Sequence, residues 1–227
     1  MKKAIISLVL VFALLSNVSA GDYSRNYRFV HDLIDCLHRL QSAALYSIED
    51  VEYELILRNL HNQIPYFKEA KMFMKKWLKN RNRAIKATAG SMYVDISEAE
   101  DAAVSLINIL SKPGREADIP DISKYASQQG DAWSKIFQTS GLALWVIAKP
   151  ARSKKPEGKI PFIISGEERQ GLIKYLNKTF RNGFEKYDRL LSQRKKGLID
   201  EFELAIPVWS ALHLRSLLTT ETYEETE

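Results

Sequence analysis

Apolar residues recur at spacings of three and four along most of this chain, the spacing that places them on one face of an α-helix. The pattern predicts helices over these ranges: 22–48, 49–64 with a continuation to 80, 97–111, 121–148, 165–196 and 201–219. The range 121–148 is either one helix or two helices divided at Gly130 and Asp131. The one run typical of a strand, 159–164, contains Pro161, which is disfavoured inside a sheet. We therefore expect an all-α fold, a single bundle of about six helices.

The range 131–148 is expected to be the central helix of this bundle. Its first half is amphipathic, whereas residues 141–148 carry no charge on any side. A helix that is apolar all round is one that other elements surround. A bilayer span needs about 20 apolar residues, and Asp131 and Lys135 interrupt this run, so no transmembrane span is expected in the mature chain.

Prolines and glycines mark the expected breaks. Pro65 removes a backbone donor and is expected either to kink the second helix or to end it, and Pro207 is expected either to kink the last helix or to start it. Gly90 lies in a stretch that indicates a turn, after which Ser97 opens the next helix through a capping box. The apolar phase crosses Gly183 unbroken, which favours one continuous helix over 165–196.

Residues 1–20 are typical of a secretory signal peptide. Two lysines precede an apolar run, and small residues at 18–20 favour cleavage between Ala20 and Gly21. The alternative is an uncleaved N-terminal anchor, which the shortness of the run disfavours. The protein is therefore expected to be secreted or periplasmic.

Residues 21–220 are long enough to bury a core within a single helical domain, and the glutamate-rich 221–227 is expected to be a disordered tail. The proline-containing 149–164 is expected to be a long loop.

The single cysteine excludes an intramolecular disulfide, and the apolar neighbours of Cys36 predict a buried, unreactive thiol. The alternative is that Cys36 forms an intermolecular disulfide. Loss of the two signal-peptide lysines lowers the formal net charge of +5 by two, and such mild basicity identifies no partner.

His31, Asp35 and His38 are the candidate metal ligands. They share one stripe of the first helix, because they are four and three residues apart. Two imidazoles and a carboxylate can bind zinc or copper when a fourth ligand is present. The competing interpretation is a solvated polar face, because the apolar stripe of that helix points the other way.

Lys68, Lys71, Lys75 and Lys79 form a candidate surface for an anionic partner. They recur at helical spacing opposite apolar residues, and the segment 68–86 holds eight basic side chains and one acid. A basic amphipathic helix can lie on an anionic lipid surface or bind an acidic partner. The alternative is a solvated face whose charges partly complement a helix end. Nucleic acid is not expected as a partner outside the cytoplasm.

No motif of the known catalytic or cofactor-binding kinds occurs in the sequence. Nucleophile elbows, phosphate loops, dinucleotide glycines, haem-attachment sites and zinc-binding helices are all missing, so no cofactor is expected. The sequence favours a binding or scaffolding module without a catalytic role. The alternative is a helical enzyme or metal protein that uses His31, Asp35 and His38, or carboxylates that converge in the bundle core.

Overall fold

The computed structural model describes residues 25–46, 53–114, 119–148, 164, 166–193 and 205–219. After a helix over 25–44, the chain forms the following helices: α2 (Tyr53–Lys75), α3 (Arg83–Leu110), α4 (Ile119–Ala148), α5 (Gly166–Thr179), α6 (Arg181–Gln193) and α7 (Ile206–Thr219). These parts contain no strand, so the predicted all-α class is confirmed. The expected signal peptide, the tail and all but the last residue of the expected loop lie outside the described residues.

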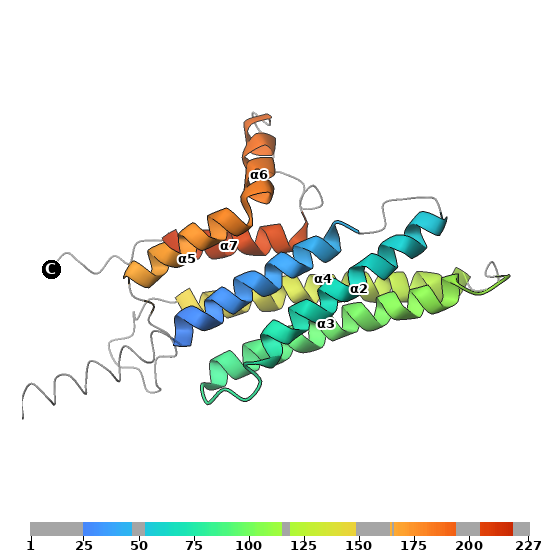
Figure 1. Ribbon diagram of the computed structural model, residues 1–227, viewed down its shortest axis with the longest axis horizontal. Helices are drawn as coiled ribbons and strands as arrows, with labels where there is room; N and C mark the ends of the chain where they lie inside the picture. Colours follow the sequence, from blue (N-terminus) through green and yellow to red (C-terminus); the bar gives the residue numbers. More distant parts are fainter. Residues whose placement is uncertain are drawn as a thin grey trace, which may run out of the picture.

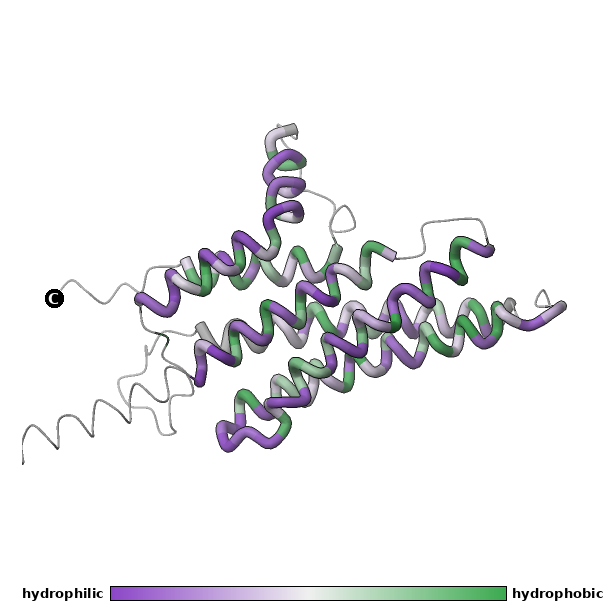
Figure 2. The backbone as a smooth tube through the Cα atoms, viewed as in Figure 1, coloured by the Kyte–Doolittle hydropathy of each residue, from purple (hydrophilic) through white to green (hydrophobic). Residues whose placement is uncertain are grey.

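The helices are stacked side by side (Figure 1). α2 and α3 form an antiparallel hairpin, and α4 returns along α3. α7 packs on α4 and α5 packs on α7, so α4 lies between α3 and the C-terminal helices. α6 projects away from the stack (Figure 1). Apolar and polar residues alternate along most helices (Figure 2), as packing through one face requires.

Every part of the stack contributes to one continuous core. Its members include the following side chains, which are almost fully buried: Phe29, Leu33, Leu37, Phe67, Met74, Ile96, Ile136, Leu176, Phe180 and Leu214. Full burial of each such side chain stabilises the fold by about 1.5–3 kcal/mol. Cys36 is also fully buried, as predicted, and burial raises the pKa of its thiol, with Asp32 and Asp35 adding to the rise. Its lack of reactivity stays a prediction.

α4 contains the range 131–148 and occupies the central position expected for it, between α3 and α7. It begins at Ile119, and Ala132 and Ile136 are buried on the side that packs. Phe137 is 43% exposed, so the amphipathic half has an open face. The side chains of 141–148 are outside the described set, and their burial on all sides stays a prediction.

α3 corrects the predicted turn near Gly90. The helix starts after Asn82, whose side-chain oxygen accepts hydrogen bonds from two first-turn N–H groups at 2.9 and 3.4 Å, and it continues through Gly90 and Ser97. The Ser97 hydroxyl donates to the carbonyl of Tyr93 at 2.8 Å, so it caps nothing. One buried face keeps its phase throughout: Ile85, Ala89, Met92, Ile96, Ala99 and Ala103. Burial of this face outweighs the roughly 1 kcal/mol that glycine costs relative to alanine inside a helix.

The two prolines expected to kink helices have different outcomes. α2 runs continuously through Pro65 from Tyr53 to Lys75, so Pro65 ends no helix, and a kink there stays a prediction. Pro207 is the second residue of α7. A first turn tolerates proline because its N–H would have no helical partner. Pro207 therefore starts the last helix, and the expected kink within that helix is wrong.

The predicted continuous helix over 165–196 is instead two helices, α5 and α6, that meet at Phe180 at a steep angle (Figure 1). The apolar residues keep their helical phase across the junction because two hydrogen bonds with α-helical spacing connect its two sides. The backbone N–H of Phe180 donates to the carbonyl of Leu176, and the N–H of Phe184 donates to the carbonyl of Phe180, both at 2.9 Å. Gly183 lies against α7, where an added Cβ would come within 2.9 Å of both methyl groups of Val208. The backbone of α6 can approach α7 this closely only because residue 183 has no side chain.

Candidate functional site

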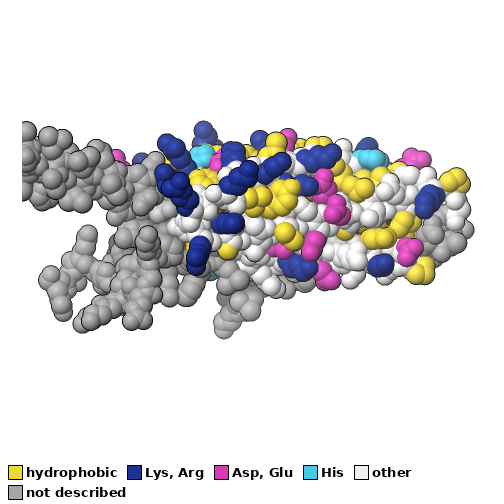
Figure 3. Space-filling model, turned by 90° about the horizontal axis from the view of Figure 1, so that it is seen from below, with side chains coloured by type: hydrophobic (Ala, Val, Ile, Leu, Met, Phe, Trp, Pro, Cys, Tyr) yellow, Lys and Arg dark blue, Asp and Glu magenta, His cyan; other side chains and the backbone are white. Residues whose placement is uncertain are grey.

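The turn between α2 and α3 carries an unusual surplus of positive charge. Five exposed cations surround it, and we call them the basic turn surface: Lys75, Lys79, Arg81, Arg83 and Lys86. Within the described residues, none of the five forms an ion pair. On the face of the molecule that Figure 3 shows, Lys and Arg side chains gather toward one end.

Of the four lysines predicted to share one face, three are on the surface. Lys68 and Lys75 are exposed on α2, and Lys79 is exposed in the turn after α2 has ended. Lys71 instead enters the α2–α3 interface, where its ammonium pairs with the carboxylate of Glu100. Glu100 is 7% exposed, and a carboxylate so deeply buried needs a cationic partner. Lys71 therefore serves the fold, and the predicted four-lysine stripe is replaced by the basic turn surface.

Two further cations near the turn are also used within the fold. Lys76 Nζ lies 3.4 Å from Asp32 Oδ1, and Arg39 Nε lies 3.0 Å from Glu69 Oε2. The first pair joins the 25–44 helix to the residue that follows α2, and the second joins the same helix to α2. Such exposed pairs contribute about 0–1 kcal/mol each. The acids near the turn are thus already partnered, and the basic turn surface is left uncompensated in the part of the chain that is described.

Three of these five cations are placed where they oppose helix stability. Arg81 precedes the N-cap of α3, and Arg83 and Lys86 lie in its first turn, which holds no acid. The amino-terminal end of a helix is itself positive, so each cation there costs about 0.3–1 kcal/mol. Only Lys75, in the last turn of α2, is placed where a cation is favourable. Complementing a helix end therefore does not explain three of the five.

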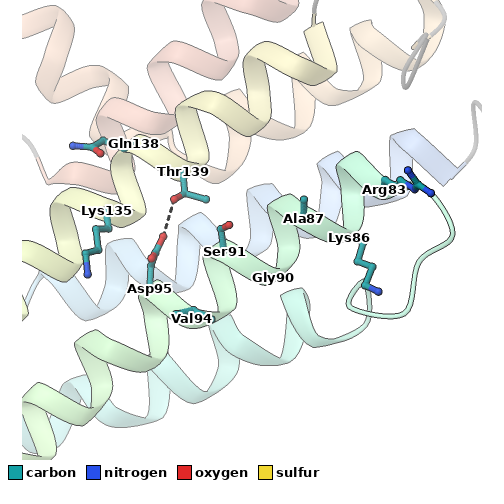
Figure 4. Close-up of a pocket in the computed structure, with 10 residues that line it drawn as sticks. All are labelled: Arg83, Lys86, Ala87, Gly90, Ser91, Val94, Asp95, Lys135, Gln138 and Thr139. Atoms are coloured by element: carbon teal, nitrogen blue, oxygen red, sulfur yellow. Dashed lines mark hydrogen bonds between the residues drawn. The ribbon is translucent and has the colours of Figure 1, made fainter. Parts of the chain in front are cut away.

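A groove of about 690 Å³ extends from the basic turn surface along α3 and α4. Figure 4 shows Arg83 and Lys86 at one end of this groove and Lys135 at the other. Between them Asp95 accepts a hydrogen bond from the Thr139 hydroxyl at 2.7 Å, which ties α3 to α4. The positive potential of the turn does not extend along this groove, because Asp95 lies within it and Lys135 at its far end pairs with Glu98, with 2.6 Å between Nζ and Oε2.

The structure separates the three residues predicted to bind a metal. His31 Nδ1 lies 3.3 Å from Asp35 Oδ2, and the possible ligand atoms of these two residues and Asp32 lie within 4.8 Å of one another. His38 is not part of this cluster. Its ring packs edge-on against Phe180, with the ring centroids 6.0 Å apart. Asp32 was not among the predicted ligands, and its position next to His31 in the sequence was the only signal for it.

Protein donors already engage the oxygens of this cluster. The Tyr175 hydroxyl donates to Asp35 Oδ1 at 2.5 Å, and its ring stacks on His31 at a centroid distance of 4.0 Å. Asp32 Oδ2 accepts from the indole N–H of Trp77 at 2.9 Å. Burial and the hydrogen bond to Asp35 raise the pKa of Tyr175 to about 12. As it stands, the cluster joins the 25–44 helix to α5 and to the segment after α2.

Buried polar pairs elsewhere are explained by packing. The Ser140 and Ser210 hydroxyls lie 2.8 Å apart between α4 and α7, and no histidine or carboxylate is among the described hydrogen-bond partners of either. Gln129 donates to the Gln63 side-chain oxygen at 2.9 Å, and Gln63 donates to the Tyr46 carbonyl at 2.6 Å. Satisfied pairs of this kind remove the cost of burying polar groups, and neither pair provides a nucleophile with its base.

Comparison with protein-family models, with curated proteins and with solved structures finds no match for this chain. No helix in the described ranges combines the length and the apolar character that a membrane crossing demands. The feature that calls for a functional explanation is therefore the basic turn surface with its adjoining groove.

Proposed function

We propose that this protein is a secreted or periplasmic, non-catalytic binding module that adsorbs to anionic lipid membranes through the basic turn surface. One observation carries the proposal: five exposed cations surround a single turn without described ion-pair partners, and three of them crowd a helix end that is already positive. Residues placed at a cost to stability are typical of functional sites.

The expected interaction is electrostatic and of moderate strength. Each basic residue close to an anionic bilayer contributes about 1 kcal/mol, so five give about 5 kcal/mol before the costs of association. Because the charges are exposed, salt screens them, and the Debye length falls from about 10 Å at 0.1 M to about 3 Å at 1 M. Binding should therefore depend on both anionic lipid and low ionic strength.

Vesicle co-sedimentation tests the proposal. The processed protein is mixed with phosphatidylserine-containing vesicles and with neutral phosphatidylcholine vesicles at 0.1 M and 1 M salt, where the Debye lengths are about 10 and 3 Å. The expected result is binding to the anionic vesicles at low salt alone. Equal recovery with the two lipids would contradict the proposal, and an acidic protein would then be the better class of partner.

Secretion is part of the same proposal. Removal of residues 1–20 leaves Gly21 at the amino terminus and takes away an apolar segment that would itself bind lipid. Mass spectrometry of the exported protein checks this, because the expected first residue is Gly21. An exported chain that still begins at Met1 would favour the alternative of an N-terminal anchor.

A second candidate function is metal binding by His31, Asp32 and Asp35. The observation in its favour is that their ligand atoms lie within 4.8 Å of one another. A metal ion would have to displace the hydroxyl of Tyr175 from Asp35 and the imidazole from the same carboxylate. Elemental analysis separates the candidates: stoichiometric zinc or copper that disappears in His31→Ala but persists in His61→Ala would favour the metal site.

A further inference from the structure

A second cavity, of about 440 Å³, lies between the end of the 25–44 helix and the junction of α5 with α6. His38, Gln41 and Ser42 line it from one side, and Lys178 and Arg181 line it from the other. None of its lining residues is acidic. Its volume falls within the range of about 300–1,000 Å³ that small-molecule sites occupy. His38, which was predicted to bind a metal cation, therefore lines a cavity that favours an anion.

The two cations of this cavity are available to a ligand. Lys178 and Arg181 are exposed at its rim, and neither forms an ion pair with any residue that the structure describes. Lys178 lies in the last turn of α5 and Arg181 is the first residue of α6, so the two helices that meet at the junction each contribute one cation. A guanidinium presents paired N–H donors that match the oxygens of phosphate.

The opposite wall supplies neutral polar groups. The amide nitrogen of Gln41 lies 3.5 Å from the point where a Cβ of Gly183 would be, so this amide is held against the first turn of α6. His38 is half-buried, and burial, with Arg39 adding to it and Asp35 opposing it, lowers the pKa of the imidazole. A neutral imidazole has one N–H donor to offer. The wall therefore contributes hydrogen bonds without adding charge.

We propose that this cavity binds the phosphate group of a small phosphate monoester, with Lys178 and Arg181 as the charged partners and His38 and Gln41 as neutral ones. A phosphate monoester carries a charge of about −1.5 to −2 at pH 7, which two cations balance, whereas a carboxylate carries half as much. The cavity exceeds the size of the phosphate itself, which leaves room for the organic part. This site is separate from the basic turn surface and does not depend on the proposed membrane binding.

Proton NMR of the histidine rings provides the test. The protein has four histidines, and His61 and His213 are exposed on other helices, so they report general salt effects. Inorganic phosphate is the probe, with acetate at equal ionic strength as the reference. A bound dianion stabilises the imidazolium, so the pKa of His38 should rise saturably with phosphate, whereas the ring signals of His61 and His213 should not respond to it. A His38 signal that phosphate does not shift, or that acetate shifts equally, would overturn the proposal.

Matched variants show whether the cavity itself is responsible. Lys178→Gln with Arg181→Gln should weaken phosphate binding at His38 by about tenfold or more, because charge-assisted hydrogen bonds are lost. The control, Lys174→Gln with Lys186→Gln, removes the same charge from exposed positions on the same two helices outside the cavity lining, and it should bind as the parent does. Equal weakening in the two double variants would overturn the assignment to this cavity.

Competition identifies the source of the monoester. Glycerol phosphate and a short-chain phosphatidic acid below its micelle concentration are each titrated against inorganic phosphate, with His38 as the reporter. Displacement by either supports the proposal, and the stronger competitor shows whether the group belongs to a free solute or to a lipid headgroup. If neither displaces inorganic phosphate, the assignment to a monoester is wrong.

Discussion

The hydroxyl of Tyr175 and the carboxylate of Asp35 are 2.5 Å apart in the structure, although 140 residues separate them in the chain. Spacing along the first helix drew attention to Asp35 and His31, and the two are indeed adjacent. It also suggested His38, which the α5–α6 junction draws into a different environment. Local periodicity identifies residues that share a helix face, but it carries no information about the distant element that will cover that face.

The burial of Tyr175 and its hydrogen bond to Asp35 predict that stability depends on pH in the alkaline range. The pKa of Tyr175 is raised from 10 to about 12 in the fold, so below pH 10 both the folded and the unfolded chain keep the proton. Between pH 10 and 12 the unfolded chain loses it first, and the free energy of unfolding falls as pH rises. Tyr175→Phe should reduce this fall. Urea midpoints at pH 9 and pH 11 for both proteins check the prediction, and parallel falls would contradict it.

Two glycines predict opposite responses to the same substitution. Gly183→Ala should destabilise the fold by about 1–3 kcal/mol, because the new methyl group would press on buried Val208. Gly90→Ala should stabilise it by about 0.4–1 kcal/mol, since Gly90 is helical and an added Cβ would meet nothing within 4 Å. Chemical denaturation measures both changes. A Gly183→Ala variant that is as stable as the parent, or more stable, would show that the close approach of α6 to α7 is wrong.

At the scale of the element, α3 shows what the pattern could and could not predict. Its second half was expected, because Ala99, Ala103 and Leu106 follow helical spacing, but Gly90 was interpreted as a turn. Burial against α2 and α4 overrides the weak local preference of a glycine. The ion pair that removes Lys71 from the surface was invisible for the same reason, because Glu100 comes from the helix that packs on it. The sequence showed that positive charge is in surplus over 68–86. It did not show which of these side chains remain on the surface without an acidic partner.

The ends of α2 and α3 predict that charge removal has opposite effects on stability. Arg83→Gln should raise the free energy of unfolding by about 0.3–1 kcal/mol, because it removes a cation from the positive end of α3. Lys75→Gln should lower that free energy by a similar amount, since Lys75 lies in the last turn of α2. Both variants should bind anionic vesicles less well. Denaturant midpoints measure the difference, and a loss of stability in Arg83→Gln would remove the argument that this cation is placed for function.

At the scale of the whole molecule, structural and surplus charges occupy different places. Cations inside the stack, such as Lys71, have acidic partners, whereas the basic turn surface lies at one end of the α2–α3 hairpin without described partners. The hairpin is held by the packing of α3 between α2 and α4, so the turn is presented on a rigid support. A concentrated positive charge is attracted to an anionic surface within about a Debye length, which is about 10 Å at 0.1 M salt.

The most direct measurement compares two charge-matched variants for binding to anionic vesicles at low salt. The turn variant carries glutamine at Lys79, Arg81, Arg83 and Lys86. The control variant carries glutamine at four exposed lysines elsewhere: Lys112, Lys124, Lys174 and Lys186. If the basic turn surface is the membrane-binding site, the control should co-sediment as the parent does, and the turn variant should bind at least about tenfold more weakly, since each lost cation removes about 1 kcal/mol. Equal binding by the two variants would mean that the turn has no special role, and the central claim would be wrong.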